Sequence, residues 1–252
     1  MPNYAIELSY NGSEFNGWQS QPNGRSVQDE IEAALRCLGE GSSVCGAGRT
    51  DSGVHARAQV ANFFLGKHWE PRRLTLALNS KLRKSVSVMR SAIAGEGFHA
   101  RHSASAREYR YFIWNSPVCY PHIRPYVLWL RGSHYDWGRA VPAARILIGR
   151  HDFRSFCRAA DCPEDAERTI LSSRLVRVGN LVILRMIAES FLTNMVRITA
   201  GNLIQIAAGR RDEAWLREIL LGGHDRSASA QTMDPSGLFL WRVLYKEKII
   251  WS

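Results

Sequence analysis

The first part of the chain alternates between the hydrophobic spacing of strands and that of helices. From Tyr4 to Tyr10, large apolar residues alternate with small or polar ones, which is typical of a half-buried strand. Ser26 then precedes an apolar stripe at helical spacing. Asp29 follows Ser26 by three positions, as in a capping box. The stripe consists of Val27, Ile31, Leu35 and Leu38. We therefore predict a strand followed by a helix.

Three further apolar runs and one proline complete the plan of this half. The runs at 43–45, 59–65 and 86–89 each predict a strand. Pro71 marks the start of a second helix through residue 82, because proline is tolerated in the first helical turn. The resulting order β-α-β-β-α-β is that of the ferredoxin-like unit.

The second half of the chain repeats this plan with one additional helix. Strands are predicted at 108–114, 171–178, 181–187 and 238–246, and helices at 137–148, 192–207 and 212–221. Gly179-Asn180 predicts a tight hairpin. We expect an α+β protein with two ferredoxin-like β-α-β-β-α-β halves, 1–104 and 105–252. They would join into a mixed, mostly antiparallel sheet with helices on one face and a basic cleft on the other.

The net charge of the chain indicates a class of binding partner. The formal net charge is +10, and only five of the 33 basic residues are lysines. Arginine is planar and binds phosphate through two parallel hydrogen bonds, so this bias suits a structured polyanion such as nucleic acid. A solvated basic surface is the alternative explanation.

The cysteines and the hydropathy pattern suggest a cytoplasmic protein. Five cysteines at irregular spacings form neither a zinc knuckle nor a secreted disulfide framework, so we expect reduced thiols. Met1 is followed by a strand rather than by a cationic and apolar leader. No run approaches the ~18 apolar residues of a membrane span, so we expect no membrane association.

The most informative stretch lies between the second and third predicted strands of the first half. Gly46 to Ala56 places one arginine and one aspartate, Arg49 and Asp51, among three glycines. Glycine permits positive φ and close backbone approach. A neighbouring guanidinium favours the ionised form of a carboxylate. A tight turn with a surface ion pair would account for the loop equally well if it stood alone.

Other segments show that the loop does not stand alone. The chain resembles the TruA-type tRNA pseudouridine synthases in five ordered motifs. They are Tyr10 to Gln19, Gly46 to Val60, Phe98 to Tyr111, His151 to Ile170 (His151-Asp152-Phe153, Phe156 and Arg168-Thr169-Ile170), and Ser190 to Gly201. The resemblance covers nearly the whole chain. It implies cofactor-free isomerisation of uridine to pseudouridine in tRNA, in which the N1–C1′ bond breaks and a C5–C1′ bond forms.

The resemblance also implies roles for four residues. Asp51 matches the catalytic aspartate of the family; attack at C1′, attack at C6 and removal of a ribose proton are all compatible with its position. Arg49 matches an arginine beside the displaced nucleotide, where it would hold phosphate. Tyr109 matches the tyrosine that packs against the target base, although strand alternation alone would equally favour Tyr111. Arg197 matches the basic residue that pairs with the aspartate, and a buried arginine requires such a partner.

Three positions depart from the family pattern. Asn11 stands where aspartate is usual, Thr193-Asn194 where an aromatic residue or histidine is common, and Asp234 where a small residue precedes proline. These departures concern substrate positioning rather than the reaction, since Arg49, Asp51, Tyr109 and Arg197 are intact.

The resemblance implies tRNA as substrate, with the anticodon stem-loop as target at positions 38 to 40, and a homodimer that shares one tRNA. Two alternatives remain: a non-catalytic RNA-binding module of the same fold, and a metal-dependent nuclease. The intact Asp51 disfavours the first, and the lack of a second carboxylate near the motif disfavours the second. The histidine pair His99 and His102 lacks an associated carboxylate cluster, so we expect no metal site.

Overall fold

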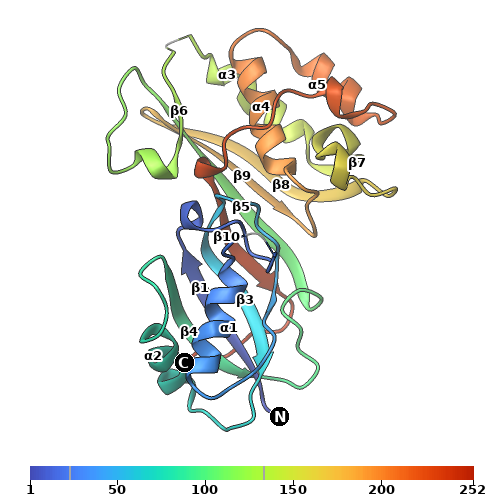
Figure 1. Cartoon of the computed structure of the whole chain (residues 1–252). Helices are drawn as coiled ribbons and strands as arrows, with labels where there is room; N and C mark the ends of the chain where they lie inside the picture. Colours follow the sequence, from blue (N-terminus) through green and yellow to red (C-terminus); the bar gives the residue numbers. More distant parts are fainter. Residues whose placement is uncertain (23, 133) are drawn as a thin grey trace. The chain divides into compact units, whose positions relative to one another are not determined.

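The computed structural model describes residues 1–22, 24–132 and 134–252. The chain divides into two compact units, of which the first contains Met1–Arg107 and Phe239–Ser252 and the second contains Glu108–Leu238 (Figure 1). The last strand of the sequence therefore groups with the first unit. The predicted halves 1–104 and 105–252 describe a repeated order of elements and stay a prediction.

The first unit contains the predicted order β-α-β-β-α-β. Its elements are β1 (Asn3–Tyr10), α1 (Val27–Cys37), β2 (Cys45–Gly46), β3 (His55–Phe64), α2 (Pro71–Asn79) and β4 (Val86–Ala94). β1 is central and pairs antiparallel with both β3 and β4. The second strand covers only Cys45 and Gly46 instead of the predicted 43–45, and after Gly46 the chain leaves the ladder to form the loop that contains Asp51.

Local signals in the sequence account for both helices of this unit. The Ser26 side chain accepts from the backbone N–H of Asp29 while the Asp29 carboxylate accepts from the backbone N–H of Ser26, as the capping box requires. Val27, Ile31 and Leu35 are fully buried along one face of α1. α2 begins at Pro71 and is capped by Glu70. It ends three residues earlier than predicted.

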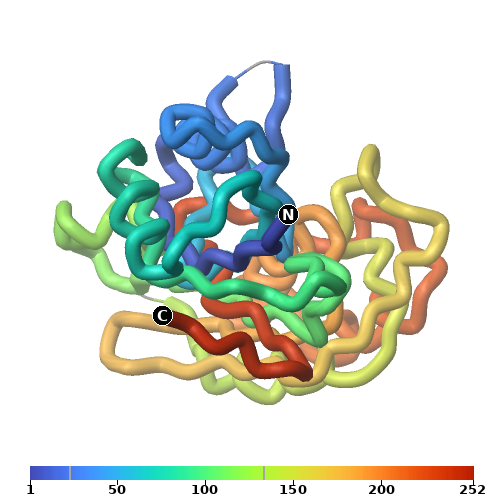
Figure 2. The backbone as a smooth tube through the Cα atoms, turned by 90° about the horizontal axis from the view of Figure 1, so that it is seen from below, coloured from blue at the N-terminus to red at the C-terminus, as the bar shows by residue number. Residues whose placement is uncertain are grey.

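The C-terminal segment completes the first unit. β10 (Leu238–Tyr245) pairs in parallel with the beginning of β3, with Phe239 opposite His55. The end of the chain then returns to β4, where the backbone N–H of Ser252 donates to the carbonyl of Ser91 at 3.0 Å. Figure 2 shows this red segment beside the N-terminal part of the chain. A parallel contact between segments so far apart in sequence leaves no local signal in the hydrophobic pattern.

The second unit contains the rest of the strands. They are β5 (Ala104–Asn115), which begins in the first unit, β6 (Leu128–Leu130), β7 (Gly149–Asp152), β8 (Glu167–Val178) and β9 (Leu181–Ala188). β8 and β9 form the predicted hairpin, in which Gly179 adopts a φ of 59°. The hydrophobic pattern missed β6 and β7, which are only three and four residues long.

Three helices belong to the second unit (Figure 1): α3 (Trp137–Ile146), α4 (Met195–Ala207) and α5 (Glu213–Leu220). α4 begins at Met195 rather than at the predicted Leu192, because Asn194 before it has a left-handed φ of 66°. In the described part of the chain, every helix is too short or too polar to span a bilayer.

The strands of the described residues form one ten-stranded sheet. The hydrogen-bonded order is β4-β1-β3-β10-β5-β9-β8-β7, with β2 beside β3 and β6 beside β5. Of the strand pairs with a defined register, β10 with β3 and β5 with β6 are parallel and the others are antiparallel. The prediction of an α+β protein with a mixed, mostly antiparallel sheet is confirmed.

Candidate active site

The loop between β2 and β3 carries two of the predicted site residues. Asp51 is half-buried and Arg49 is exposed, whereas Thr50 between them is only 6% exposed. Burial of Thr50 fixes the backbone between two outward-facing charged residues. The exposed guanidinium of Arg49 can therefore bind an anionic group next to an aspartate whose backbone is fixed.

The motif that follows β1 holds this loop from one side. The backbone N–H of Trp18 donates to the carbonyl of Thr50 at 3.0 Å, and that of Gly53 donates to the carbonyl of Phe15 at 3.3 Å. The hydroxyls of Tyr10 and Thr50 lie 2.8 Å apart in a buried hydrogen bond. Burial raises the pKa of Tyr10, so its hydroxyl stays protonated at physiological pH. The first motif therefore supports the loop that contains Asp51.

Glycine is required on both sides of this contact for steric reasons. A Cβ on Gly17, whose φ is 96°, would meet the carbonyl oxygen of Thr50 at 2.6 Å. A Cβ on Gly46 would lie 2.4 Å from the Trp18 ring. Gly53 adopts a φ of 78°. Close approach is thus the reason for Gly46, and positive φ the reason for Gly53.

The opposite side of the loop is held by hydrogen bonds to its carbonyls. Gln59 Nε2 donates to the carbonyl of Gly48 at 2.7 Å. Arg107 donates to the carbonyl of Ala47 from Nε at 3.1 Å and from Nη2 at 2.8 Å. Its Nη2 also donates to the carbonyl of Arg101. One guanidinium thus connects the start of the loop that contains Asp51 to the segment before β5.

A thiol and two imidazoles lie near the start of the loop. Cys45 Sγ is 3.5 Å from His99 Nε2, and the His99 and His102 ring centroids are 4.3 Å apart. Burial raises the pKa of Cys45, and Arg101 and Arg49 oppose that rise. The described residues contain no group of three or more His, Cys, Asp or Glu side chains placed to hold a metal ion.

The other two predicted site residues belong to the second unit. Tyr109 in β5 is 8% exposed, and its ring meets that of Phe191 edge to face with centroids 5.0 Å apart. Tyr111 is fully buried and donates its hydroxyl to the carbonyl of Asp234 at 2.6 Å. Tyr111 is therefore a core tyrosine, whereas Tyr109 packs against the motif that contains Phe191.

Arg197 is held in the first turn of α4. Its Nε donates to the carbonyl of Met233 at 2.7 Å and its Nη1 to Asn194 Oδ1 at 2.7 Å. Among the described residues, Asn194 is the only non-glycine residue with a positive φ, a conformation that asparagine tolerates better than most residues. The side chain of Asp234 caps the following 3-10 helix. Two of the departures from the family pattern, Asn194 and Asp234, thus lie near Arg197, and Asn194 accepts a hydrogen bond from its guanidinium.

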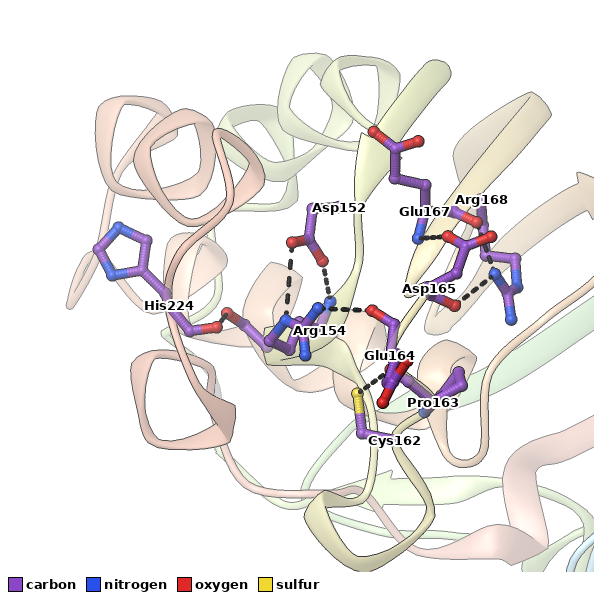
Figure 3. A network of polar contacts seen from close by, with 10 residues as sticks. Asp152, Arg154, Cys162, Pro163, Glu164, Asp165, Glu167, Arg168 and His224 are labelled. Carbon is purple, nitrogen blue, oxygen red and sulfur yellow. Dashed lines mark hydrogen bonds and ion pairs between the residues drawn. The ribbon is translucent and has the colours of Figure 1, made fainter.

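The motif from His151 to Ile170 forms a different kind of structure. β7 and β8 pair with Asp152 opposite Glu167. Arg154 donates to the carbonyl of Glu164 at 2.8 Å and forms an ion pair with Asp152, while Arg168 donates to the carbonyl of Asp165 at 3.2 Å (Figure 3). These contacts stabilise the acidic turn between the two strands.

The structure thus groups Arg49 and Asp51 on one loop of the first unit, and places Tyr109 and Arg197 in the second. The pairing of Asp51 with Arg197 stays a prediction. Sequence reasoning did not assign the residues that support the site, namely Tyr10, Gly17, Trp18, Gln59, Arg107, Phe191 and Asn194. All of them lie within the five motifs, so the motifs were the available signal.

Comparison with known proteins agrees with these motifs. The family model for tRNA pseudouridine synthase matches residues 7–103 and 143–246. The tRNA pseudouridine synthase A of Brevibacillus brevis is 39% identical over 94% of this chain and 97% of its own length. The tRNA pseudouridine synthase A of Agrobacterium fabrum is 40% identical over 99% of this chain and 94% of its own length. That of Pseudomonas aeruginosa is 39% identical over 96% of this chain and 85% of its own length.

A solved structure of a Cbf5–Nop10–Gar1 complex aligns over 96% of this chain and 60% of that chain, at 11% identity and a TM-score of 0.35, a likeness too weak to support a fold assignment. The sequence comparisons are strong by contrast, since they extend over nearly the whole chain. The chain belongs to the tRNA pseudouridine synthase family, the isomerases that convert uridine to pseudouridine in tRNA.

Proposed function

We propose that Asp51 is the catalytic carboxylate of this isomerase. The observation that carries the proposal is the fixed geometry of its loop, which contacts the first motif on one side and Gln59 and Arg107 on the other. A carboxylate can act on a nucleotide only if it is aimed before the substrate arrives, since a mobile side chain would have to be ordered during the reaction. No cofactor is needed, because breaking N1–C1′ and forming C5–C1′ leaves the oxidation state unchanged.

The other three residues would bind the displaced nucleotide and orient the groups that react. Arg49 is exposed beside Asp51, where its guanidinium would hold a phosphate of the displaced nucleotide. Tyr109, packed edge to face on Phe191, would present its ring to the target base. Arg197, whose position is fixed by Asn194 and the carbonyl of Met233, would pair with Asp51 and keep it ionised.

The family resemblance supports the finer assignment of the substrate. We propose the anticodon stem-loop at positions 38 to 40 as target, a homodimer that shares one tRNA, and a cytoplasmic location. The net charge of +10 supports a polyanionic partner. We further propose that helices cover one face of the sheet and that tRNA occupies a basic cleft on the other.

Release of tritium tests the assignment of Asp51. With tRNA labelled at uridine C5, formation of the C5–C1′ bond releases the label to water, and EDTA in the assay stops a metal-dependent nuclease. We expect Asp51→Ala and Asp51→Asn to lower release by about 10³-fold or more. Glu96→Gln removes an exposed carboxylate from the same unit and serves as the matched control. Unchanged release in Asp51→Ala would refute the proposal.

Arg197→Ala tests the pairing. We expect turnover to be lost while tRNA binding survives, since Arg197 acts on Asp51 rather than on the body of the tRNA. Near-normal turnover would contradict this role. Binding without any tritium release from the wild-type chain would favour the non-catalytic RNA-binding module.

A further inference from the structure

A long connection in the second unit exposes aromatic rings instead of burying them. The chain leaves β5 after Asn115, loops outward and returns as β6 at Leu128 (Figure 1). In this loop Tyr120 is 56% exposed and Val118 74% exposed. Exposed apolar side chains gathered on one ordered segment indicate an interaction surface. The aromatic surface comprises Trp114, Tyr120, His122, Arg124, Trp129 and Arg131.

Backbone pairing and hydrogen bonds fix the rings of this surface. Trp114 and Trp129 are direct partners in the parallel pair of β5 and β6. Their indole N–H groups donate, each at 2.8 Å, to the carbonyls of Val118 and Ser116, respectively. The rings of Trp114 and Tyr120 have centroids 5.7 Å apart. These contacts leave the rings little rotational freedom to lose when a ligand binds.

The stack extends outward from Tyr120. The imidazole of His122 lies 5.6 Å from the Tyr120 ring, centroid to centroid. Three prolines, Pro117, Pro121 and Pro125, punctuate the loop and restrict its unfolded conformations. An exposed connection held in this way is preorganised for binding.

Two arginines add positive charge to the surface. The guanidinium carbons of Arg124 and Arg131 lie 4.9 and 4.3 Å from the centroid of the Trp129 ring. Among the described residues, neither arginine forms an ion pair with a carboxylate. The sequence from 109 to 135 contains no aspartate or glutamate. The surface is therefore cationic and aromatic, without a neutralising acid in its own segment.

We infer that the aromatic surface binds tRNA, with phosphates on Arg124 and Arg131 and an unpaired base stacked on Tyr120. Proteins bind single-stranded RNA through this combination of ring faces and guanidinium groups. A second copy of the chain is disfavoured as the occupant, because a two-fold contact through this surface would place its own arginines against each other in a chain of net charge +10.

This inference rests on the proposed function, since tRNA is the polyanion that the enzyme must hold. It adds a contact in the second unit that is separate from Asp51 and Arg49. Binding and catalysis are therefore measured independently, so that either assignment can fail alone.

The experiment measures the Kd of unmodified tRNA for the full-length chain over a range of salt concentrations, together with kcat and KM for tritium release. We expect Tyr120→Ala to weaken binding about tenfold through loss of stacking. Arg124→Gln with Arg131→Gln should reduce the slope of log Kd against log salt by about 1.4 to 1.8, as two lost phosphate contacts require. KM should rise in both variants while kcat stays unchanged.

Two matched variants separate this site from general charge. Arg124→Lys with Arg131→Lys keeps the charge and should retain the salt slope. Arg174→Gln with Arg177→Gln removes two exposed charges from β8 of the same unit and should leave Kd within about twofold of wild type. Thermal melts confirm that each variant is folded.

Three results would overturn the inference. The first is an unchanged Kd in Tyr120→Ala and in the Arg124 and Arg131 double variant. The second is an equal loss in the β8 control, which would indicate non-specific charge. The third is sedimentation of these variants as monomers where the wild-type chain is a dimer, without a change in Kd, which would make the surface a protein interface. Loss of tritium release in Asp51→Ala, whatever these results, supports the proposed function separately.

Discussion

Removal of the Tyr10 hydroxyl, which contacts the loop that contains Asp51, tests how Asp51 is held. Tyr10→Phe deletes the oxygen that lies 2.8 Å from Thr50 Oγ1, and both residues are almost fully buried. Leaving a buried hydroxyl without its partner costs about 1–3 kcal/mol. We expect the free energy of unfolding to fall by about 1–2 kcal/mol. A similar loss of positioning in the transition state would lower kcat about tenfold.

Tyr4→Phe is a matched control on the same strand. The Tyr4 hydroxyl donates to the carbonyl of Trp69 at 2.9 Å and accepts from its backbone N–H at 2.7 Å. Its loss should destabilise the fold at least as much as Tyr10→Phe, because two hydrogen bonds disappear. Tyr4 lies at the other end of β1, six residues from Tyr10, so kcat for tritium release should change by less than about twofold.

A double-mutant cycle isolates the hydrogen bond itself. Thr50→Val removes the other hydroxyl, and the double variant leaves neither group unsatisfied. We expect the combined loss of stability to be smaller than the sum of the single losses by about 1 kcal/mol. Additive losses, or an equal decrease of kcat in Tyr4→Phe, would refute the view that this contact positions Asp51. Urea denaturation and steady-state tritium release measure the two quantities.

Three other changes probe separate features. Arg107→Lys keeps the charge but cannot reproduce the guanidinium contacts with Ala47, so kcat should fall more than KM rises; equal changes would contradict a positioning role. Asn194→Gly relieves the left-handed backbone but deletes the acceptor of Arg197, so turnover should fall with stability nearly unchanged, whereas Asn194→Asp should retain turnover.

Hydrogen bonds from the first backbone N–H groups of α2 lower the pKa of Glu70 below its ordinary value of 4.5. The ionised carboxylate therefore stabilises the folded protein above pH 4.5, and this contribution is lost as the pH falls through the lowered pKa of the folded state. Glu70→Gln should therefore flatten the acid limb of the stability curve in urea titrations, and an unchanged limb would exclude this contribution.

Local chemistry in the sequence was sufficient for both helices of the first unit and for one hairpin of the second. The capping box at Ser26 and the proline at Pro71 placed α1 and α2, and Gly179-Asn180 placed the β8–β9 hairpin. Each of these signals determines the backbone of only a few neighbouring residues, and at these positions tertiary contacts do not change the local structure. The same locality explains the errors, since β6 and β7 are too short to show a period.

The motifs alone were sufficient to indicate the family, and they drew attention to Arg49 and Asp51, which lie on the loop between β2 and β3. They did not show how that loop is held. Its support comes from Tyr10 and Trp18 on one side and Arg107 on the other, which lie 30 to 60 positions away in the sequence. Contacts over such separations depend on where whole strands pair, and no local pattern encodes that pairing.

The sequence by itself determined the order of elements in the first unit and the family. Only the tertiary structure decided that β10 returns to pair in parallel with β3 in the first unit, and that α4 begins after a left-handed Asn194 that holds Arg197. The physical reason is the range of the forces involved. Hydrophobic periodicity and capping act over one or two turns, whereas strand pairing and the packing of a loop are settled by the free energy of the whole fold.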